Sequence, residues 1–154
     1  MRIVVTSDVH RRQKSLLDII ERHLENADLF INLGDSEEDV DAALLLYPNL
    51  KIKRVAGNCD WSSALPICKT INAGGKKILF CHGHTVYVKH GYEMLEERAK
   101  SENVDICLFG HTHVPYLERK DGICYMNPGA VCDGVYGIID IVGGEIMAYH
   151  AKID

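Results

Sequence analysis

The first third of the chain contains three short apolar runs, and each one ends in polar residues. Residues 2–6, 28–32 and 51–55 carry these runs, whose β-branched and apolar composition predicts three strands. Two predicted helices separate the runs, so the predicted order is β-α-β-α-β. Parallel strands joined by right-handed crossover helices have this order.

The two predicted helices are set by different signals. Apolar residues recur at spacings of three and four over residues 15–24, which places them on one helical face. These residues are Leu16, Leu17, Ile20 and Leu24. The second helix is predicted to begin with Ser36 as its N-cap and to end near Tyr47, before Pro48. Acidic residues follow Ser36, where the helix dipole favours negative charge.

The second half of the chain predicts hairpins and one further helix. The predicted strands include residues 66–71, 77–81 and 105–109, and the predicted helix is 91–100. Gly74-Gly75, Asp121-Gly122 and Gly143-Gly144 are typical hairpin turns. We therefore expect an α/β fold in which two mixed sheets pack face to face and helices flank them. This is a four-layer α-β-β-α sandwich, predicted as a single domain over residues 1–154.

Composition narrows the classes of function. The chain has 154 residues, of which 47% are hydrophobic and 25% charged, as in ordinary globular domains. Its net charge is -5 and it has no long basic run, so nucleic acid is not expected as a stable partner. The apolar run at the start is too short for a secretion signal, and no apolar stretch could span a membrane. We expect a cytoplasmic protein with no membrane partner.

The six cysteines do not suggest a disulfide framework, because none of them shows Cys-x-x-Cys spacing and the chain has enough core residues. Most of them are expected to be reduced, buried small apolar residues. These are Cys68, Cys81, Cys107, Cys124 and Cys132. Cys59 is the exception, because it lies among polar residues that follow a strand.

Residues able to bind metal follow five of the predicted strands. They are Asp8 and His10, Asp35 after Gly34, Asn58 within Gly57–Asp60, His82, and His111 with His113. One such residue alone is usually a turn former or a surface histidine, but five strand ends in this order favour metal. Oxygen and imidazole ligands suit Mn, Fe, Zn or Ni. Seven ligands are too many for one tetrahedral ion and suit two.

The ordered motifs D-x-H, G-D, G-N-x-D, H and G-H-x-H cover nearly the whole chain, and Asn127-Pro128-Gly129 accompanies them. The chain thereby resembles the calcineurin-like metallophosphoesterase family, in its small cap-less phosphodiesterase branch of the YfcE and MJ0936 type. The resemblance implies two divalent metal ions and a bridging hydroxide as nucleophile. It assigns Asp8, His10 and His113 to one metal, Asn58, His82 and His111 to the other, and Asp35 to the bridge.

The resemblance also implies catalytic roles around Asn58. Cys59 occupies a position where many relatives carry a histidine that assists the leaving group, and a neutral thiol is a weaker proton donor. Asp60 is expected to orient a neighbouring group, with a helix or turn cap as the alternative. His84 could approach the phosphate or be a plain surface histidine. The other histidines, His23, His90 and His150, are expected to be exposed.

These observations predict a hydrolase that cleaves small phosphate esters, and phosphodiesters are the first expectation for its substrates. Mn is the first choice of metal, and Ni, Fe, Zn or Mg are the other candidates. The first alternative is a phosphomonoesterase with the same site. The second is a non-catalytic interaction scaffold like the retromer subunit that resembles this family. The complete set of coordinating side chains favours the enzyme. The oligomeric state is left open, and a homo-oligomer is one candidate because exposed edge strands offer a route to self-association.

Overall fold

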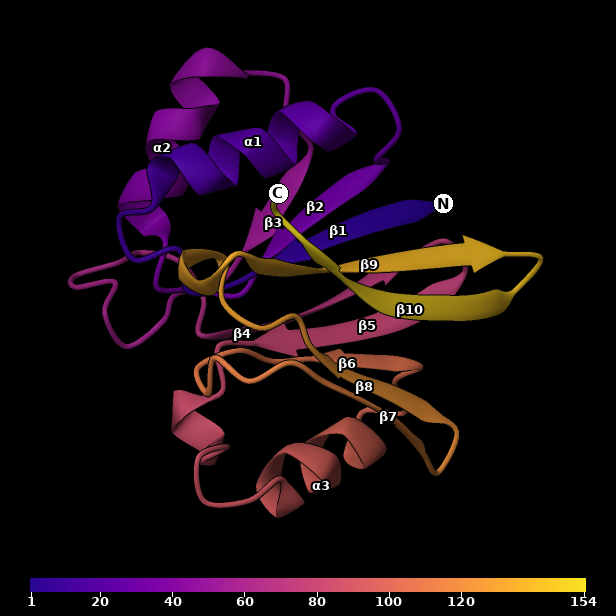
Figure 1. The fold of residues 1–154 in the computed structure, drawn as a ribbon. Helices are drawn as coiled ribbons and strands as arrows, with labels where there is room; N and C mark the ends of the chain where they lie inside the picture. The colour runs from indigo at the N-terminus through magenta and orange to yellow at the C-terminus, as the bar shows by residue number, and fades with distance from the viewer.

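The computed structural model describes residues 1–154 and consists of two five-stranded sheets that face each other. The first sheet has the order β10-β9-β1-β2-β3, and the second has the order β4-β5-β6-β8-β7. Helices α1 and α2 cover the outer face of the first sheet, and α3 covers the outer face of the second (Figure 1). This is the four-layer α-β-β-α sandwich that the sequence predicts.

The first sheet combines the start and the end of the chain. Its parallel strands β1, β2 and β3 come from the β-α-β-α-β half, and β9 pairs with β1 in the antiparallel direction. The elements of this half of the molecule are β1 (Arg2–Thr6), α1 (Gln13–His23), β2 (Leu29–Asn32), α2 (Glu37–Leu46), β3 (Ile52–Arg54), β9 (Val135–Val142) and β10 (Glu145–Lys152).

The second sheet is built from the middle of the chain. Strands β5, β6 and β8 are parallel, and β4 and β7 are antiparallel strands at the two edges. The elements are β4 (Cys68–Ala73), β5 (Lys76–Cys81), η1 (His84–Val86), α3 (Glu93–Ser101), β6 (Ile106–Leu108), β7 (Tyr116–Lys120), β8 (Ile123–Asn127) and η2 (Val131–Asp133). The strand predicted over residues 66–71 thus begins two residues later, after Pro66 and Ile67.

Three apolar clusters hold the layers together. The central one lies between the sheets and includes Ile31, Phe80 and Ile139, all of them fully buried or nearly so. A second cluster packs α1 and α2 against the first sheet, and a third packs α3 against the second. Because strand side chains alternate between faces, each sheet contributes to the central cluster and to one outer cluster. This double burial explains the nearly continuous apolar runs of the inner strands.

Helix α1 corrects two predictions. Leu24 lies just beyond the end of the helix and is exposed, whereas Ile19 joins Leu16 and Ile20 on the buried face. His23 was expected to be exposed but is only 6% exposed, and its Nε2 lies 3.0 Å from the Tyr136 hydroxyl. Tyr136 comes from β9, so no local sequence pattern signals this partner.

The beginning of α2 shows a second difference. Ser36 is the N-cap residue by position, but its hydroxyl makes no capping hydrogen bond. It donates instead to the Gly34 carbonyl and accepts from the N–H of Val9. The free N–H groups of the first turn are satisfied by a carboxylate from another loop, described below.

All six cysteines are free thiols, of which Cys81, Cys107 and Cys124 are buried, Cys68 and Cys132 half-buried and Cys59 exposed. His90 is exposed, but His150 is half-buried and its Nε2 lies 2.7 Å from the Asn127 carbonyl oxygen. No helix has both the length and the apolar composition that a membrane span requires.

Candidate metal centre

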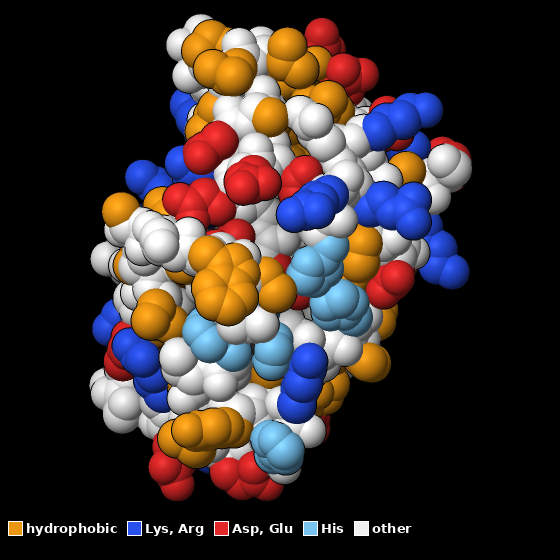
Figure 2. Space-filling view, turned by 90° about the vertical axis from the view of Figure 1, so that its left-hand side faces the viewer, with side chains coloured by type: hydrophobic (Ala, Val, Ile, Leu, Met, Phe, Trp, Pro, Cys, Tyr) orange, Lys and Arg blue, Asp and Glu red, His pale blue; other side chains and the backbone are white.

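The predicted ligands meet where the two sheets join at one end of the sandwich. Asp8 and His10 follow β1, Asp35 follows β2, and Asn58 follows β3. His82 follows β5, whereas His111 and His113 follow β6 in the other sheet. Figure 2 shows histidine side chains gathered in the middle of this face, with acidic side chains on one side of them. Residues from both sheets therefore build one site.

The backbone bends sharply at most of these positions. Asp8, His10, Asp35, His111 and His113 all have positive φ values between 46° and 69°. Residues other than glycine rarely adopt this left-handed region, and such strain concentrates at functional sites. The bends let residues two apart in sequence, such as His111 and His113, direct their side chains toward the same centre.

The loops after β2 and β3 approach each other closely through two glycines. A Cβ atom at Gly34, whose φ is +103°, would lie 2.5 Å from the backbone nitrogen of Gly57. A Cβ atom at Gly57 would lie 2.1 Å from Asp35 Oδ1. Larger residues at either position would push Asp35 and Asn58 apart.

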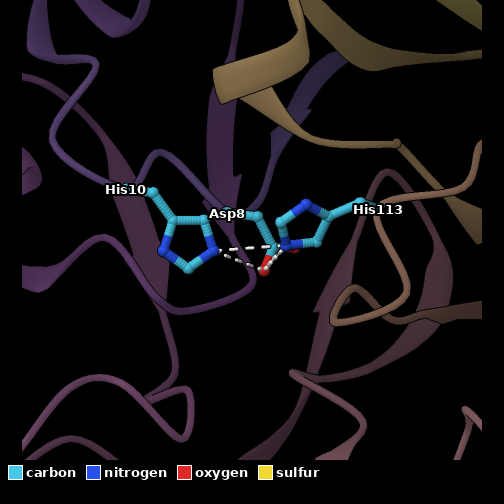
Figure 3. Close-up of side chains that lie close together, drawn as sticks. All are labelled: Asp8, His10 and His113. Atoms are coloured by element: carbon cyan, nitrogen blue, oxygen red, sulfur yellow. Dashed lines mark hydrogen bonds and ion pairs between the residues drawn. The ribbon is translucent and has the colours of Figure 1, made fainter.

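Asp8, His10 and His113 form the first group of converging ligand atoms (Figure 3). The two Nε2 atoms of His10 and His113 lie 3.2 Å apart, and Asp8 Oδ1 lies 3.5 Å and 3.2 Å from them. The imidazoles approach the carboxylate from either side in Figure 3. This spacing and donor set would suit one divalent cation.

Asp35, His82 and His111 form the second group, and Asn58 joins it. His82 Nε2 lies at the centre, 3.2 Å from Asp35 Oδ2, 3.1 Å from Asn58 Oδ1 and 3.1 Å from His111 Nδ1. Asp35 Oδ2 also lies 3.8 Å from His10 Nε2 of the first group. Asp35 thus lies between the two groups.

Asp8 provides the clearest test of whether these residues fit a cation. Its Oδ2 accepts hydrogen bonds from the Ser7 hydroxyl at 2.5 Å and from the His111 N–H at 3.1 Å. Its Oδ1 is buried and has no hydrogen-bond partner, although it faces three histidine Nε2 atoms. An unpaired buried carboxylate oxygen is costly, and a bound cation would satisfy it. The residues therefore fit a metal.

The charges of the second group are strongly coupled. Burial acts to raise the pKa of Asp35, but His82 and the N–H of Cys59 hold that pKa well below its usual range. Burial acts to lower the pKa of His82, but Asp35 and Asp8 raise it above its ordinary value. For His111, burial and the neighbouring His82 lower the pKa to about 4. The site therefore holds an ionised Asp35 and a neutral His111 near pH 7.

Asp60 holds the loops that carry the ligands. Its carboxylate accepts hydrogen bonds from the N–H groups of Asp35 and Gly57, both at 2.7 Å. It also accepts from Ser36 and Glu37 at 3.0 Å, in the first turn of α2. The carboxylate that bonds the first turn of α2 therefore also bonds the backbone of Asp35.

Cys59 and His84 lie beside the ligands. The Cys59 N–H donates to Asp35 Oδ1 at 2.7 Å, and its exposed thiol accepts from Asn58 Nδ2 at 3.5 Å. Burial, followed by the charge of Asp35, raises the pKa of the Cys59 thiol. The ring centre of His84 lies 5.5 Å from that of His82, and its buried Nδ1 has no partner.

Sequence reasoning missed several supporting contacts. His82 Nδ1 lies 2.8 Å from the Leu33 carbonyl oxygen, so this nitrogen carries the proton and Nε2 faces the site. Asn127 Nδ2 donates to Gly110 O and Thr112 Oγ1, which steadies the loop carrying His111 and His113. The N-P-G motif signals Asn127 in the sequence, but no local pattern signals a backbone carbonyl as a partner.

The arrangement of two sheets flanked by helices matches the metallophosphoesterase fold. A model of the calcineurin-like phosphoesterase superfamily domain matches residues 1–142. The chain belongs to this family, which binds divalent metals.

Two curated relatives span most of the chain. A probable metallophosphoesterase, YsnB of Bacillus subtilis, is 34% identical over 132 residues, covering 85% of this chain and 75% of its own. The phosphodiesterase MJ0936 of Methanocaldococcus jannaschii is 26% identical and covers 97% of both chains.

Solved structures agree with this fold. A predicted phosphoesterase from Streptococcus pneumoniae is 25% identical, with a TM-score of 0.79 over 97% of both chains. Vps29 of Chaetomium thermophilum has a TM-score of 0.81 over 99% of this chain and 89% of its own, at 18% identity. The second likeness concerns the fold alone.

Proposed function

We propose that this protein is a metal-dependent phosphodiesterase that binds two divalent cations. Asp8, His10 and His113 hold one cation, and Asn58, His82 and His111 hold the other, with Asp35 between them. The observation that supports this most directly is the buried, unpartnered Asp8 Oδ1, which faces imidazole nitrogens of both groups. The phosphodiesterase name of MJ0936 supports the choice of phosphodiesters.

When bound, two such cations lower the pKa of a shared water, clamp phosphate oxygens and stabilise the charge that develops during in-line displacement. The chain itself provides a preorganised frame for this chemistry. Asp35 is kept anionic, and His82 is held in one tautomer by the Leu33 carbonyl. Asp60 fixes the two loops that carry Asp35 and Asn58. Outer hydrogen bonds of this kind orient metal ligands.

Cys59 and His84 border the place where an ester would lie, and we assign them to contacts with the phosphate or the leaving group. Cys59 is exposed at the site and adjoins Asn58, whereas His84 adjoins His82. A thiol supplies little proton donation to a basic leaving group near pH 7. The preferred substrates are therefore small phosphodiesters with good leaving groups.

Mn²⁺ is the first candidate metal, and Ni²⁺, Fe²⁺, Zn²⁺ and Mg²⁺ are the other candidates. Six free thiols are consistent with a cytoplasmic location.

The likeness to Vps29 keeps an interaction scaffold as the second candidate function. The specific observation in its favour is a fold similarity that covers nearly the whole chain. The seven coordinating side chains are all present here and converge, which favours the enzyme over the scaffold. A phosphomonoesterase would use the same residues.

One experiment tests the proposal. The purified protein is stripped with a chelator and assayed on bis(4-nitrophenyl) phosphate and 4-nitrophenyl phosphate, with and without Mn²⁺. We expect stripping to abolish hydrolysis, Mn²⁺ to restore it, and the diester to be the better substrate. Undiminished hydrolysis by metal-free protein would contradict the mechanism. Mn²⁺ binding without hydrolysis of either ester would favour the scaffold.

A further inference from the structure

Two cysteines outside the metal centre face each other across a strand pair. Cys68 begins β4 and Cys81 ends β5, and the antiparallel register places them directly opposite. Both side chains pack in the cluster beneath α3, so they lie on the same face of the sheet. Strand β4 is the edge of the second sheet, which leaves Cys68 half-buried rather than fully covered (Figure 1).

The backbone hydrogen bonds show which kind of pair this is. The hairpin turn consists of Gly74 and Gly75, both with positive φ, so the flanking residues Ala73 and Lys76 form a hydrogen-bonded pair. Pair types alternate along an antiparallel ladder, which makes Cys68 and Cys81 a non-hydrogen-bonded pair. The N–H and C=O groups of Lys77 bond to Asp105, away from β4. Cys81 lies an even number of residues after Lys77, so its N–H and C=O groups also point away from β4.

This pair type has the geometry that a disulfide requires. The Cα atoms of directly opposed residues in a non-hydrogen-bonded pair are about 4.5 Å apart, and their side chains are the closest in a ladder. Disulfides span Cα separations of about 4.4 to 6.8 Å. The expected separation lies within this range, so the register allows the bond.

The surroundings of Cys68 also favour its reaction. Cys68 is the more accessible thiol of the two, at the edge of the sheet. The interaction between the two thiols lowers the pKa of Cys68 and raises that of Cys81, and Arg98 in α3 also lowers the pKa of Cys68, against burial and the charge of Glu102. A thiolate that is partly accessible and has a second thiol beside it is the usual arrangement of a peroxide-sensitive cysteine. Cys124, by contrast, is buried between the sheets.

We propose that Cys68 and Cys81 are a modification site, forming a reversible disulfide with hydrogen peroxide as the oxidant, and that this bond weakens metal binding at His82. Peroxide transfers one oxygen to the Cys68 thiolate and gives a sulfenic acid and hydroxide. The Cys81 sulfur then attacks the Cys68 sulfur, the S–O bond breaks, and water leaves. In total, two thiols and one peroxide give one disulfide and two waters.

The effect on the metal centre follows from sequence adjacency. Cys81 immediately precedes His82, whose fully buried ring is held within 3.2 Å of Asp35, Asn58 and His111. Drawing the Cys81 side chain toward β4 would rotate the backbone at the base of His82. This second half of the proposal rests on the proposed metal centre, whereas the disulfide itself does not.

The disulfide is tested on the full chain by peroxide treatment, alkylation under denaturing conditions and peptide mapping. We expect one internal bond between Cys68 and Cys81, with a loss of two hydrogen atoms in mass that a thiol reductant reverses. Cys68→Ser should lose the bond, and the matched variant Cys132→Ser should keep it. Two free thiols at these positions after treatment, or a bond to Cys107 instead, would overturn the proposal.

The coupling is tested by calorimetric Mn²⁺ binding to reduced and oxidised protein. We expect about tenfold weaker binding after oxidation, the size of effect that a displaced orienting group has on metal affinity. Peroxide-treated Cys68→Ser should keep its affinity, which separates the disulfide from oxidation of Cys59. Equal affinity of the reduced and disulfide-bonded forms would overturn the coupling. Absence of Mn²⁺ binding to the reduced protein would instead refute the proposed function.

Discussion

The two sheets make different contributions to the site. Loops of the first sheet provide every oxygen donor, from Asp8, Asp35 and Asn58, together with one imidazole, from His10. Loops of the second sheet provide imidazoles only, from His82, His111 and His113. In the proposed site, the negative charge therefore comes from one sheet, and most of the nitrogen donors come from the other. Each candidate cation position needs both, so the packing of the sheets determines whether a complete site exists.

The largest expected effect comes from removing one ligand on each side of this division. Asp35→Asn in the first sheet and His82→Asn in the second should each weaken Mn²⁺ binding by more than about 100-fold, beyond what loss of an outer partner costs. The rate of diester hydrolysis should fall together with the Mn²⁺ affinity. Calorimetry and circular dichroism would separate loss of metal from loss of fold. If His82→Asn retains both ions, the first sheet alone builds the site and the comparison fails.

The next effect concerns the frame of the first sheet. Asp60→Ala leaves four backbone N–H groups without their acceptor, and it should lower the free energy of unfolding by about 2 kcal/mol. It should also weaken Mn²⁺ binding by about tenfold, because Asp35 is no longer fixed. Chemical denaturation and calorimetry measure the two effects.

Asp121→Asn is the matched control for Asp60→Ala, because Asn removes the charge and tolerates the positive φ of 52° at this turn position. Asp121 is an exposed carboxylate that pairs with Lys100 at a hairpin of the second sheet. Its loss should change stability by less than about 0.5 kcal/mol and leave Mn²⁺ affinity unchanged. Equal effects of the two variants would show that Asp60 has no special role in positioning Asp35.

A smaller effect is expected at Cys59, the exposed thiol on the first-sheet side. Cys59→Ala should change hydrolysis of an activated aryl diester only a few-fold, while Cys59→His should preferentially help esters with more basic leaving groups. Rates across aryl esters of graded leaving-group pKa would show this. Complete loss of activity in Cys59→Ala with metal still bound, or a phosphocysteine intermediate, would contradict it.

The smallest effect concerns His23, on the face of the first sheet away from the site. Burial lowers the pKa of His23 below its ordinary value of 6.5, so the unfolded chain binds a proton more readily than the folded one. The contribution of neutral His23 to the free energy of unfolding is fully present above pH 6.5, and it is lost as the pH falls through the lowered pKa of His23 in the folded protein. Urea unfolding between pH 7.5 and 5 should show a decline that is reduced in His23→Gln. An unchanged slope in that variant would assign the decline to other groups.

The sequence alone determined the order of the strands and the strand ends that carry the predicted ligands. Apolar runs bounded by polar residues have a local cause, because a strand buried on both faces must be apolar and must end where the chain turns. The motifs that contain Asp8, Asp35, Asn58, His82 and His111 each come after one of these strands in the chain. The family resemblance carried by those motifs is confirmed by the match over residues 1–142. The assignment of each residue to one metal remains a prediction.

Only the tertiary structure decided which groups meet across long distances in the chain. His23 is buried because Tyr136 of β9 lies above it, and α2 is capped by Asp60 rather than by Ser36. Cys68 faces Cys81 because a two-residue turn sets the register of β4 and β5. Predictions from local propensity use only the neighbours of each residue in the sequence. Their roles depend on partners 24 or 113 residues away, or on a register that shifts every side chain if it slips by one residue.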